Sequence, residues 1–242
     1  MLTYILIGVA VGFVLLLCFC LAIANFSFDN YNEKLQQLDG VKNSYNITTR
    51  DYVAAINHKY FKDTLRLASC PKYYDNYSKK TISLSAETMF SNGLASLSIV
   101  SHELGHARQD ATGDKLQKHW QLRKVGRIIG RLFLPLILIG IILSVLNVFE
   151  VLNHLAVLIV GGVCLGLGVL IFFFAIILKY KEIKIEREAS DFAIEYLSEI
   201  LTENEIKTCK EFLKSARLTY WASLIKVLFG WTFLTKKEKM FY

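Results

Sequence analysis

The sequence contains too few well-placed cysteines for a disulfide-bonded scaffold. It has 242 residues and five cysteines, and no Cys-x-x-Cys pair occurs. Three of the five lie inside apolar stretches, which leaves only Cys70 and Cys209 in polar sequence. This usage excludes a disulfide framework and a cysteine-based metal site, and it fits a reducing compartment.

Charge is absent from three long stretches of the chain. Hydrophobic residues make up 53% of the sequence, above the usual range for a soluble domain. The stretches Thr3–Ala24, Leu132–Phe149 and Leu155–Leu178 are each uncharged and about as long as a membrane-crossing helix. The second and third are separated by a very short loop and so predict a helical hairpin. The first lacks a basic start and exceeds the apolar core of a signal peptide, which favours a retained anchor.

A fourth apolar stretch, Tyr220–Leu234, is shorter and contains Lys226. Its length favours a segment that lies at the membrane interface or packs on the protein, although a tilted helix of this length can also cross.

The net charge of +7 is distributed in a way typical of a membrane protein. Nearly all of the 28 Lys and Arg residues fall in segments 26–127 and 179–242, and none in the hairpin loop. An even number of crossings separates the two basic segments, so they share one side. The basic bias predicts the cytoplasmic side, with the N-terminus outside and the lipid bilayer as a partner. No aromatic and basic motif suggests nucleic acid binding.

Residue patterns predict a small mixed α and β unit between the first and second membrane stretches. Ile47–Phe61 is amphipathic, with Thr48 or Thr49 as N-cap, and Ala86–Gln109 also reads as a helix. Residues 64–68 and Thr81–Ser85 alternate as strands do, and residues 75–78 are turn-like. A charged helix is expected at Glu182–Glu199.

Two of the five histidines carry the clearest chemical signal. His102 and His106 stand one helical turn apart in His-Glu-Leu-Gly-His, so both imidazoles leave the same helix face and can bind one zinc ion. Glu103 projects from the helix about 100° around its axis from His102. It therefore does not readily join the histidines as a ligand, but it can reach a zinc-bound water as general base. In a sequence of this composition, fewer than about 0.01 matches to His-Glu-x-x-His are expected by chance.

A catalytic zinc site needs a third protein ligand and an open position for water, whereas a structural zinc has four protein ligands. The remaining histidines are poorly placed: His58 is on the early helix, His119 in a basic stretch and His154 at the outer hairpin turn. Acidic residues after the hairpin are better candidates, and the pattern alone leaves four open: Glu182, Glu186, Glu188 and Asp191. Ser190 follows Glu186 by one turn and is suited to a supporting hydrogen bond.

Several of these segments together resemble one protein family. Ser101–Gln109, the preceding strand Thr81–Ser85 and the later run Glu186–Ser190 resemble the YugP-like membrane zinc metallopeptidases. Residues 216–220 look like the C-terminal segment of that family, and the wider layout is similar to HtpX-type membrane proteases. Residues 72–75 depart from the Asp-His-Tyr-Asp-like run common at that place.

The resemblance implies one zinc ion per chain, held by His102, His106 and Glu186, with Glu103 as catalytic base. It implies an endopeptidase whose substrate is a membrane-associated protein or peptide. In proteases of this design an edge strand aligns the substrate, and the candidate strand consists of Thr81, Ile82, Ser83, Leu84 and Ser85. Candidates for stabilising the oxyanion are Tyr73, Tyr74, His119 and Tyr220.

The sequence therefore predicts a mainly α membrane protein with three or four membrane helices and a small α+β zincin-like catalytic domain. Its expected parts are an anchor (1–25), a catalytic segment (26–127), a transmembrane hairpin (128–178) and a third-ligand helix with a membrane-associated end (179–242). The expected location is the plasma membrane of a bacterial-type cell, multi-pass, with the site facing the cytoplasm. The alternative is a non-catalytic membrane scaffold with a structural metal site. Oligomeric state is open.

Overall fold

The computed structural model describes residues 2–72, 74–113, 121, 124–126, 128–129, 131–149, 151 and 154–229. Within α1 and α8 the side chains of residues 2–14, 16–17 and 223–229 are not described. The helices are α1 (Leu2–Asp39), α2 (Thr49–Phe61), α3 (Ala86–Phe90), α4 (Leu94–Ala111), α6 (Phe133–Val148), α7 (Leu155–Leu197) and α8 (Glu203–Phe229). The strands are β1 (Arg66–Ser69), β2 (Asn76–Ser78) and β3 (Thr81–Leu84).

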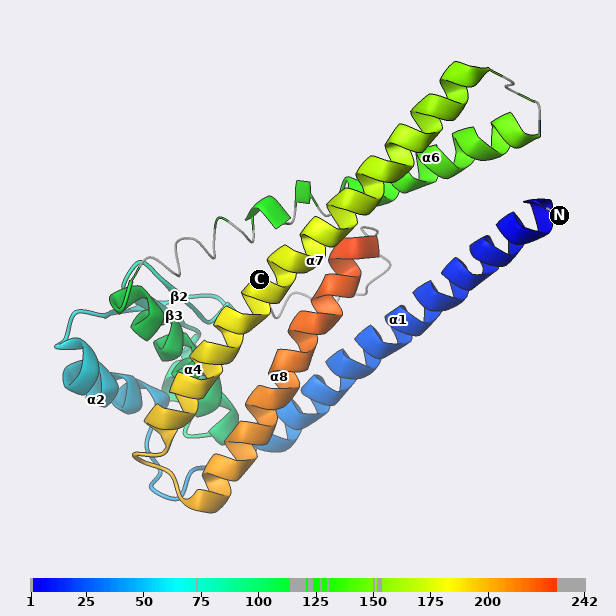
Figure 1. Cartoon of the computed structure of the whole chain (residues 1–242). Helices are drawn as coiled ribbons and strands as arrows, with labels where there is room; N and C mark the ends of the chain where they lie inside the picture. Colours follow the sequence, from blue (N-terminus) through cyan, green and yellow to red (C-terminus); the bar gives the residue numbers. More distant parts are fainter. Residues whose placement is uncertain are drawn as a thin grey trace.

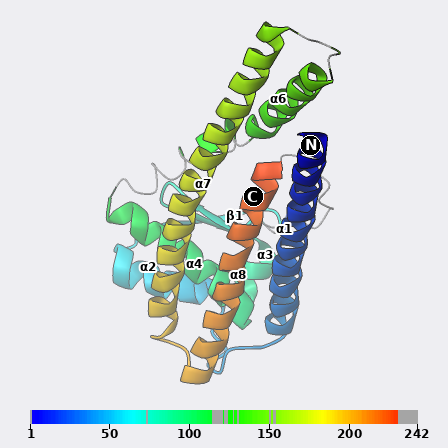
Figure 2. The ribbon, with the colours of Figure 1, turned by 45° about the vertical axis from the view of Figure 1, so that its right-hand side comes forward.

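Long helices extend in one direction from a compact body (Figures 1 and 2). The body contains α2, α3, α4 and the sheet, together with the adjoining ends of α1, α7 and α8. Its core is apolar and includes Tyr52, Ile82, Leu97, Tyr196 and Phe212. The start of α1, the α6–α7 hairpin and the end of α8 all lie away from this body, on the same side of it.

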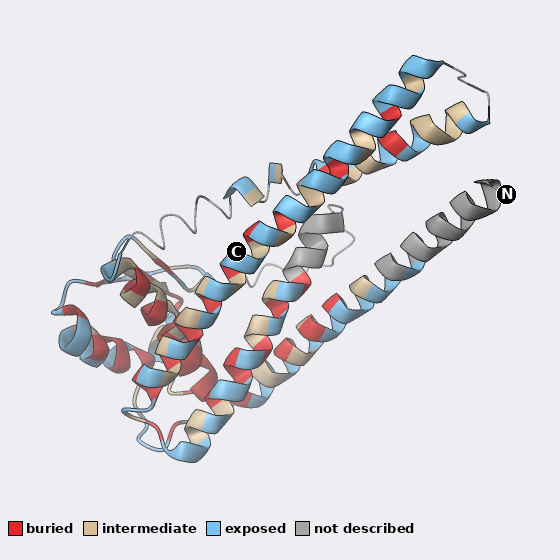
Figure 3. Cartoon of the chain, in the orientation of Figure 1, coloured by how far each residue is buried: buried red, intermediate tan, exposed pale blue. Residues whose placement is uncertain are grey.

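The predicted hairpin is present, and glycines allow its two helices to pack closely. A Cβ atom at Gly140 would lie 2.8 Å from the carbonyl oxygen of Gly161, and one at Gly168 would lie 3.2 Å from that of Phe133. The opposite faces carry large exposed apolar side chains, including Leu158, Leu167, Leu170 and Phe173 (Figure 3). Small residues between the two helices and large apolar residues on their outer faces are the arrangement expected of helices that face lipid.

Among the described residues, α7 alone is long and apolar enough to cross a membrane, and α6 is a shorter apolar helix. Three or four membrane helices therefore remain a prediction. The expected anchor forms part of α1, which continues well past Ala24 to Asp39. The apolar stretch that begins at Tyr220 is helical as far as Phe229, and the rest of it lies outside the described residues.

The sheet differs from the prediction in one respect that matters for the site. β2, a segment expected to be a turn, pairs antiparallel with β3, and β1 pairs parallel with β3 on its other side. The order β1-β3-β2 makes β3 the central strand. The expectation that Thr81–Ser85 forms an edge strand is therefore wrong, because both of its edges already hold neighbouring strands.

The helix predicted over Ala86–Gln109 is broken into α3 and α4 at residues 91–93. The break is stabilised by Asn43, in the segment before α2, and by Thr49, the first residue of α2. The backbone N–H of Thr49 donates to the Ser91 carbonyl at 2.8 Å, and that of Asn43 donates to the Asn92 carbonyl at 2.9 Å. These two carbonyls are thereby satisfied outside the helix, and α4 starts afresh at Leu94 with its own orientation.

The charged helix expected at Glu182–Glu199 is not a separate element. It is the second half of α7, a single helix of 43 residues that begins in the hairpin and ends in the body. Three polar residues of this half, Glu182, Glu186 and Ser190, are buried against the body. The predicted α2 is confirmed, with Thr48 as its N-cap.

Candidate metal centre

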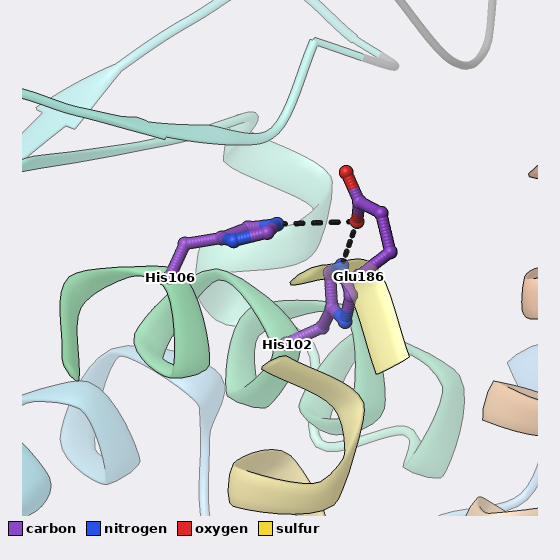
Figure 4. Close-up of side chains that lie close together, drawn as sticks. All are labelled: His102, His106 and Glu186. Carbon is purple, nitrogen blue, oxygen red and sulfur yellow. Dashed lines mark hydrogen bonds and ion pairs between the residues drawn. The ribbon is translucent and has the colours of Figure 1, made fainter. Parts of the chain in front are cut away.

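Three side chains from two helices converge at one point in the body. His102 and His106 come from α4 and Glu186 comes from α7 (Figure 4). The Oε2 atom of Glu186 lies 3.1 Å from Nε2 of His102 and 3.3 Å from Nε2 of His106. Both histidines are half-buried and Glu186 is only 3% exposed.

The spacing of these atoms fits a divalent metal. Each residue offers one ligand atom, and the three atoms lie within 4.8 Å of one another. In a tetrahedral zinc site with bonds near 2.0–2.1 Å, ligand atoms are about 3.3 Å apart, close to the two distances observed. Two imidazole nitrogens and one carboxylate oxygen are also a donor set typical of catalytic zinc.

Hydrogen bonds to the outer ring nitrogens orient both histidines. The side-chain N–H of Gln109 donates to the Ile185 carbonyl at 2.8 Å, so its oxygen accepts from Nδ1 of His106, 2.9 Å away. The Ser190 hydroxyl donates to the Glu186 carbonyl at 3.0 Å and accepts from Nδ1 of His102 at 3.2 Å. With Nδ1 protonated in both rings, both Nε2 atoms are directed at the metal position.

A glycine lets the two ligand-bearing helices approach. A Cβ atom at Gly105 would lie 2.3 Å from the carbonyl oxygen of Ala189, closer than side chains are ever found. Gly105 lies between the two histidines on α4, and Ala189 follows Glu186 by three residues on α7. The glycine within His-Glu-Leu-Gly-His thus brings Glu186 within reach of the two histidines.

Glu103 lies beside the three ligands but is held by a different element. Its Oε2 accepts the backbone N–H of Tyr77, in β2, at 2.7 Å. Burial raises the pKa of the Glu103 carboxyl, while the nearby His106 and His102 and the Tyr77 N–H lower it. A carboxylate that is desolvated and held next to a metal position has the properties of a general base.

The electrostatics of the three ligands favour a cation among them. Burial, the largest single influence, lowers the pKa of His106, but Glu186 together with Glu103 and Gln109 raises it to about 9 in all. Without metal, a proton on His106 therefore balances the charge of Glu186 at neutral pH. A divalent metal would take the place of that proton.

The other acidic candidates for third ligand have different partners. Glu182 pairs with Lys179 at 2.8 Å, Glu188 accepts from Gln109 at 3.1 Å, and Asp191 lies 3.8 Å from Arg217. Of the four acidic residues considered from the sequence, Glu186 is the one placed between the histidines.

Among the described residues, His58, His154 and Tyr74 are not part of this group. His58 makes an exposed pair with Asp63, and His154 precedes α7 at the far end of the hairpin. Tyr74 is 43% exposed on the loop before β2. His119 and Tyr73 lie outside the described residues.

Two residues of β3 belong to the core. Ile82 and Leu84 are fully buried there, and Ser85, which follows the strand, is the N-cap of α3. The strand next to the site is β2, through Tyr77. Tyr77 also donates its hydroxyl to Asp110 on α4 at 2.6 Å, which ties this strand to the ligand helix. The sequence did not predict a role for Tyr77 or Gln109, although Gln109 stands three residues after His106 and so shares its helix face.

Comparison with known proteins gives one match, which agrees with this geometry. The model of a family described as "putative neutral zinc metallopeptidase" matches residues 12–234. No curated protein matches the chain. No solved structure matches it either.

Proposed function

Because the chain belongs to this family of neutral zinc metallopeptidases, we propose that it is a membrane-embedded, zinc-dependent endopeptidase. The observation that carries the proposal is the convergence of His102, His106 and Glu186 on one point, with the Glu103 carboxylate beside it. The more specific likeness to YugP-like and HtpX-type proteins is part of the proposal.

Each residue of the site has a distinct task in this reaction. His102, His106 and Glu186 would hold one zinc ion, which would supply Lewis-acid activation of a scissile carbonyl and of water. Glu103 would accept the proton of the attacking water and pass it to the leaving amine. The Tyr77 N–H holds the Glu103 carboxylate during both steps, and Gln109 and Ser190 keep the two imidazoles in the binding tautomer.

The proposed membrane location depends on the hairpin formed by α6 and α7. Its outward faces are apolar and exposed, and lipid is the solvent that suits them. The basic bias of the sequence assigns the body, and with it the site, to the cytoplasmic face of a bacterial-type plasma membrane. The proposed partners are the lipid bilayer and a protein or peptide substrate.

The second candidate function is a scaffold with a structural zinc. A structural site has four protein ligands. In the described part of the chain, the group that can hold a metal has three members. A three-ligand site leaves a position for water, which favours the enzyme.

Glu103→Gln tests the enzyme directly. The variant keeps the Tyr77 hydrogen-bond partner and all three ligands, so we expect about one zinc per chain and a fall in hydrolysis of denatured casein of roughly 10²–10⁴-fold. Glu33→Gln, an exposed change on α1, is the matched control and should keep full activity. Full activity in Glu103→Gln would contradict the role of Glu103. Zinc binding with no hydrolysis by the wild type would favour the scaffold.

A further inference from the structure

We propose that the metal centre stands in water just beyond the lipid headgroups, and that its substrates are polypeptides anchored in the same membrane. On this proposal, the bond that is cut lies about four or more residues outside the substrate's own membrane span. The inference rests on the proposed function and specifies its substrate class and the position of the cleaved bond.

The height of the centre is set by α7, because this helix contains both the apolar stretch and Glu186. The helix is unbroken from Leu155 to Leu197. Its uncharged stretch ends at Leu178, since Lys179 follows, and Glu186 stands eight residues after Leu178. At 1.5 Å per residue, Glu186 lies about 12 Å further along the helix than Leu178.

The residues between these two points suit the headgroup layer. Tyr180, Lys181 and Lys184 are all exposed, and they occupy the first two turns after the apolar half. Tyrosine and lysine are the residues expected where a helix passes through headgroups. That layer is about 5–7 Å thick on each side of a bilayer, so a centre about 12 Å from the hydrocarbon is outside it.

The packing of the helix that carries the histidines places the metal centre at the same height as Glu186. His102 and His106 project from α4, which packs in the body with Leu97, Leu104 and other core residues. Gly105 on α4 is pressed against Ala189 on α7, so the body cannot slide along α7 without losing the site. The height of Glu186 is therefore the height of the whole centre.

A fixed height selects substrates by geometry. A bond inside the hydrocarbon lies at least about 12 Å from the ligands, a gap that about four extended residues span at 3.3 Å each. In a substrate anchored in the same bilayer, every peptide bond more than about four residues outside the membrane span can reach the site, and the anchor keeps these bonds near it. Anchoring also raises its effective concentration, whereas a soluble chain must find the site from bulk solution.

The first experiment uses the full-length protein in liposomes with a set of anchored substrates. A casein segment that the protein cuts in solution is placed after a single transmembrane helix, with flexible spacers of roughly 1, 4, 8 and 16 residues. We expect cutting from the four-residue spacer upward, about 10–100-fold faster than for the same segment without an anchor. Cutting inside the span, equal cutting at one residue, or equal rates for the free segment would overturn the proposal.

The second experiment needs no activity, so it separates this inference from the proposed function. Single cysteines replace Phe173, Ile177, Lys181 and Lys184 in the protein in lipid nanodiscs, and a membrane-impermeant maleimide is applied. Modification is read site by site by mass spectrometry. We expect modification at 181 and 184 and protection at 173 and 177. Protection at 184 would place the centre in the hydrocarbon and overturn its height, even if the protein proves to be a protease.

Discussion

The first half of α7, Leu155–Leu178, buries mainly small residues and exposes large apolar ones, whereas the second half buries two carboxylates among apolar residues and exposes charges. The buried residues of the first half are Gly161, Gly168, Ala175 and Leu178. The second half buries Glu182, Glu186 and Ser190 together with Ala189, Ala193, Tyr196 and Leu197, and its exposed residues include Lys181, Lys184, Arg187, Asp191 and Glu195. One continuous helix thus has an apolar outer surface in its first half and a charged one in its second.

The difference shows how each half is stabilised. On the proposal that the hairpin lies in lipid, burying an apolar side chain brings no hydrophobic gain, and close packing of glycine against a neighbouring helix would hold the hairpin together. In the body, polar groups can be buried only if they are paired, and Glu186 is paired with two histidines. Glycine recurs at Gly105, where its small size serves a metal site instead of a hairpin.

Gly105→Ala is expected to have the largest effect on this comparison. Its Cβ atom would strike the backbone of Ala189, which cannot move without moving Glu186, and we expect a cost of about 3 kcal/mol together with loss of bound zinc. The measurements are zinc per chain and thermal unfolding.

Gly162→Ala, in the hairpin half of α7, is the matched control. Nothing lies within 4 Å of a Cβ atom there, so the change should be neutral or slightly stabilising. Normal zinc content in Gly105→Ala would show that close approach of α4 and α7 is not required.

Leu167→Arg tests whether the first half of α7 faces lipid. Leu167 is 47% exposed, and a charge near the middle of a membrane helix costs about 2.5–3.5 kcal/mol. We expect a sharp loss of membrane-integrated protein, measured by alkaline extraction. Arg187→Leu, at an exposed position in the second half, should change stability by no more than about 0.5 kcal/mol. If both variants integrate into the membrane like the wild type, the first half of α7 does not face lipid, and the contrast between the two halves is wrong.

Gln109→Leu is expected to weaken the metal site without unfolding the body. The variant removes the acceptor for Nδ1 of His106 and the donor to Ile185, and losses of this kind reduce metal affinity by about 10–100-fold. Competition with a zinc chelator measures the affinity. Gln109→Glu keeps an acceptor for His106 and should bind zinc more tightly than Gln109→Leu; the opposite order would argue against the tautomer role.

The pH dependence of the metal-free protein tests the charge pairing at the site. Because Glu186, with Glu103 and Gln109, raises the pKa of His106 from 6.5 to about 9, this protonated histidine stabilises the folded state fully below pH 6.5. That contribution is lost as the pH rises through 9, so the unfolding temperature of the metal-free protein should fall over this range. His106→Gln should flatten the fall, and His58→Gln, at an exposed position, should not. An unchanged slope in His106→Gln would assign it to another group.

Local patterns were enough to predict the elements that depend on them. The His-Glu-Leu-Gly-His helix, the hairpin and the Thr48 cap all follow from spacing, hydropathy or capping preferences within a few residues. The choice of Glu186 among four acidic residues came from resemblance, because nothing local distinguishes it from Glu182. Only the packing of α7 on α4 does so.

The errors in prediction arose where distant segments intervene. β3 is central because the short strand β2 pairs with it, and three residues carry too little pattern to identify a strand. The helix from Ala86 is interrupted because Asn43 and Thr49, more than 40 positions earlier, bind the carbonyls at the break. Gln109 and Tyr77 act on the site through hydrogen bonds to other elements, which a linear motif does not reveal.

The order of the ligands along the chain bears on the protein's biosynthesis. Glu186 follows His102 by 84 positions, and the whole α6–α7 hairpin lies between them. A ribosome therefore releases both histidines and Glu103 well before the residue that completes the site. Glu186 reaches them only after the hairpin has formed and turned the chain back. A nascent chain thus holds an incomplete set of ligands until the hairpin is in place. On the proposed function, this order would keep the protease inactive until it is inserted in its membrane.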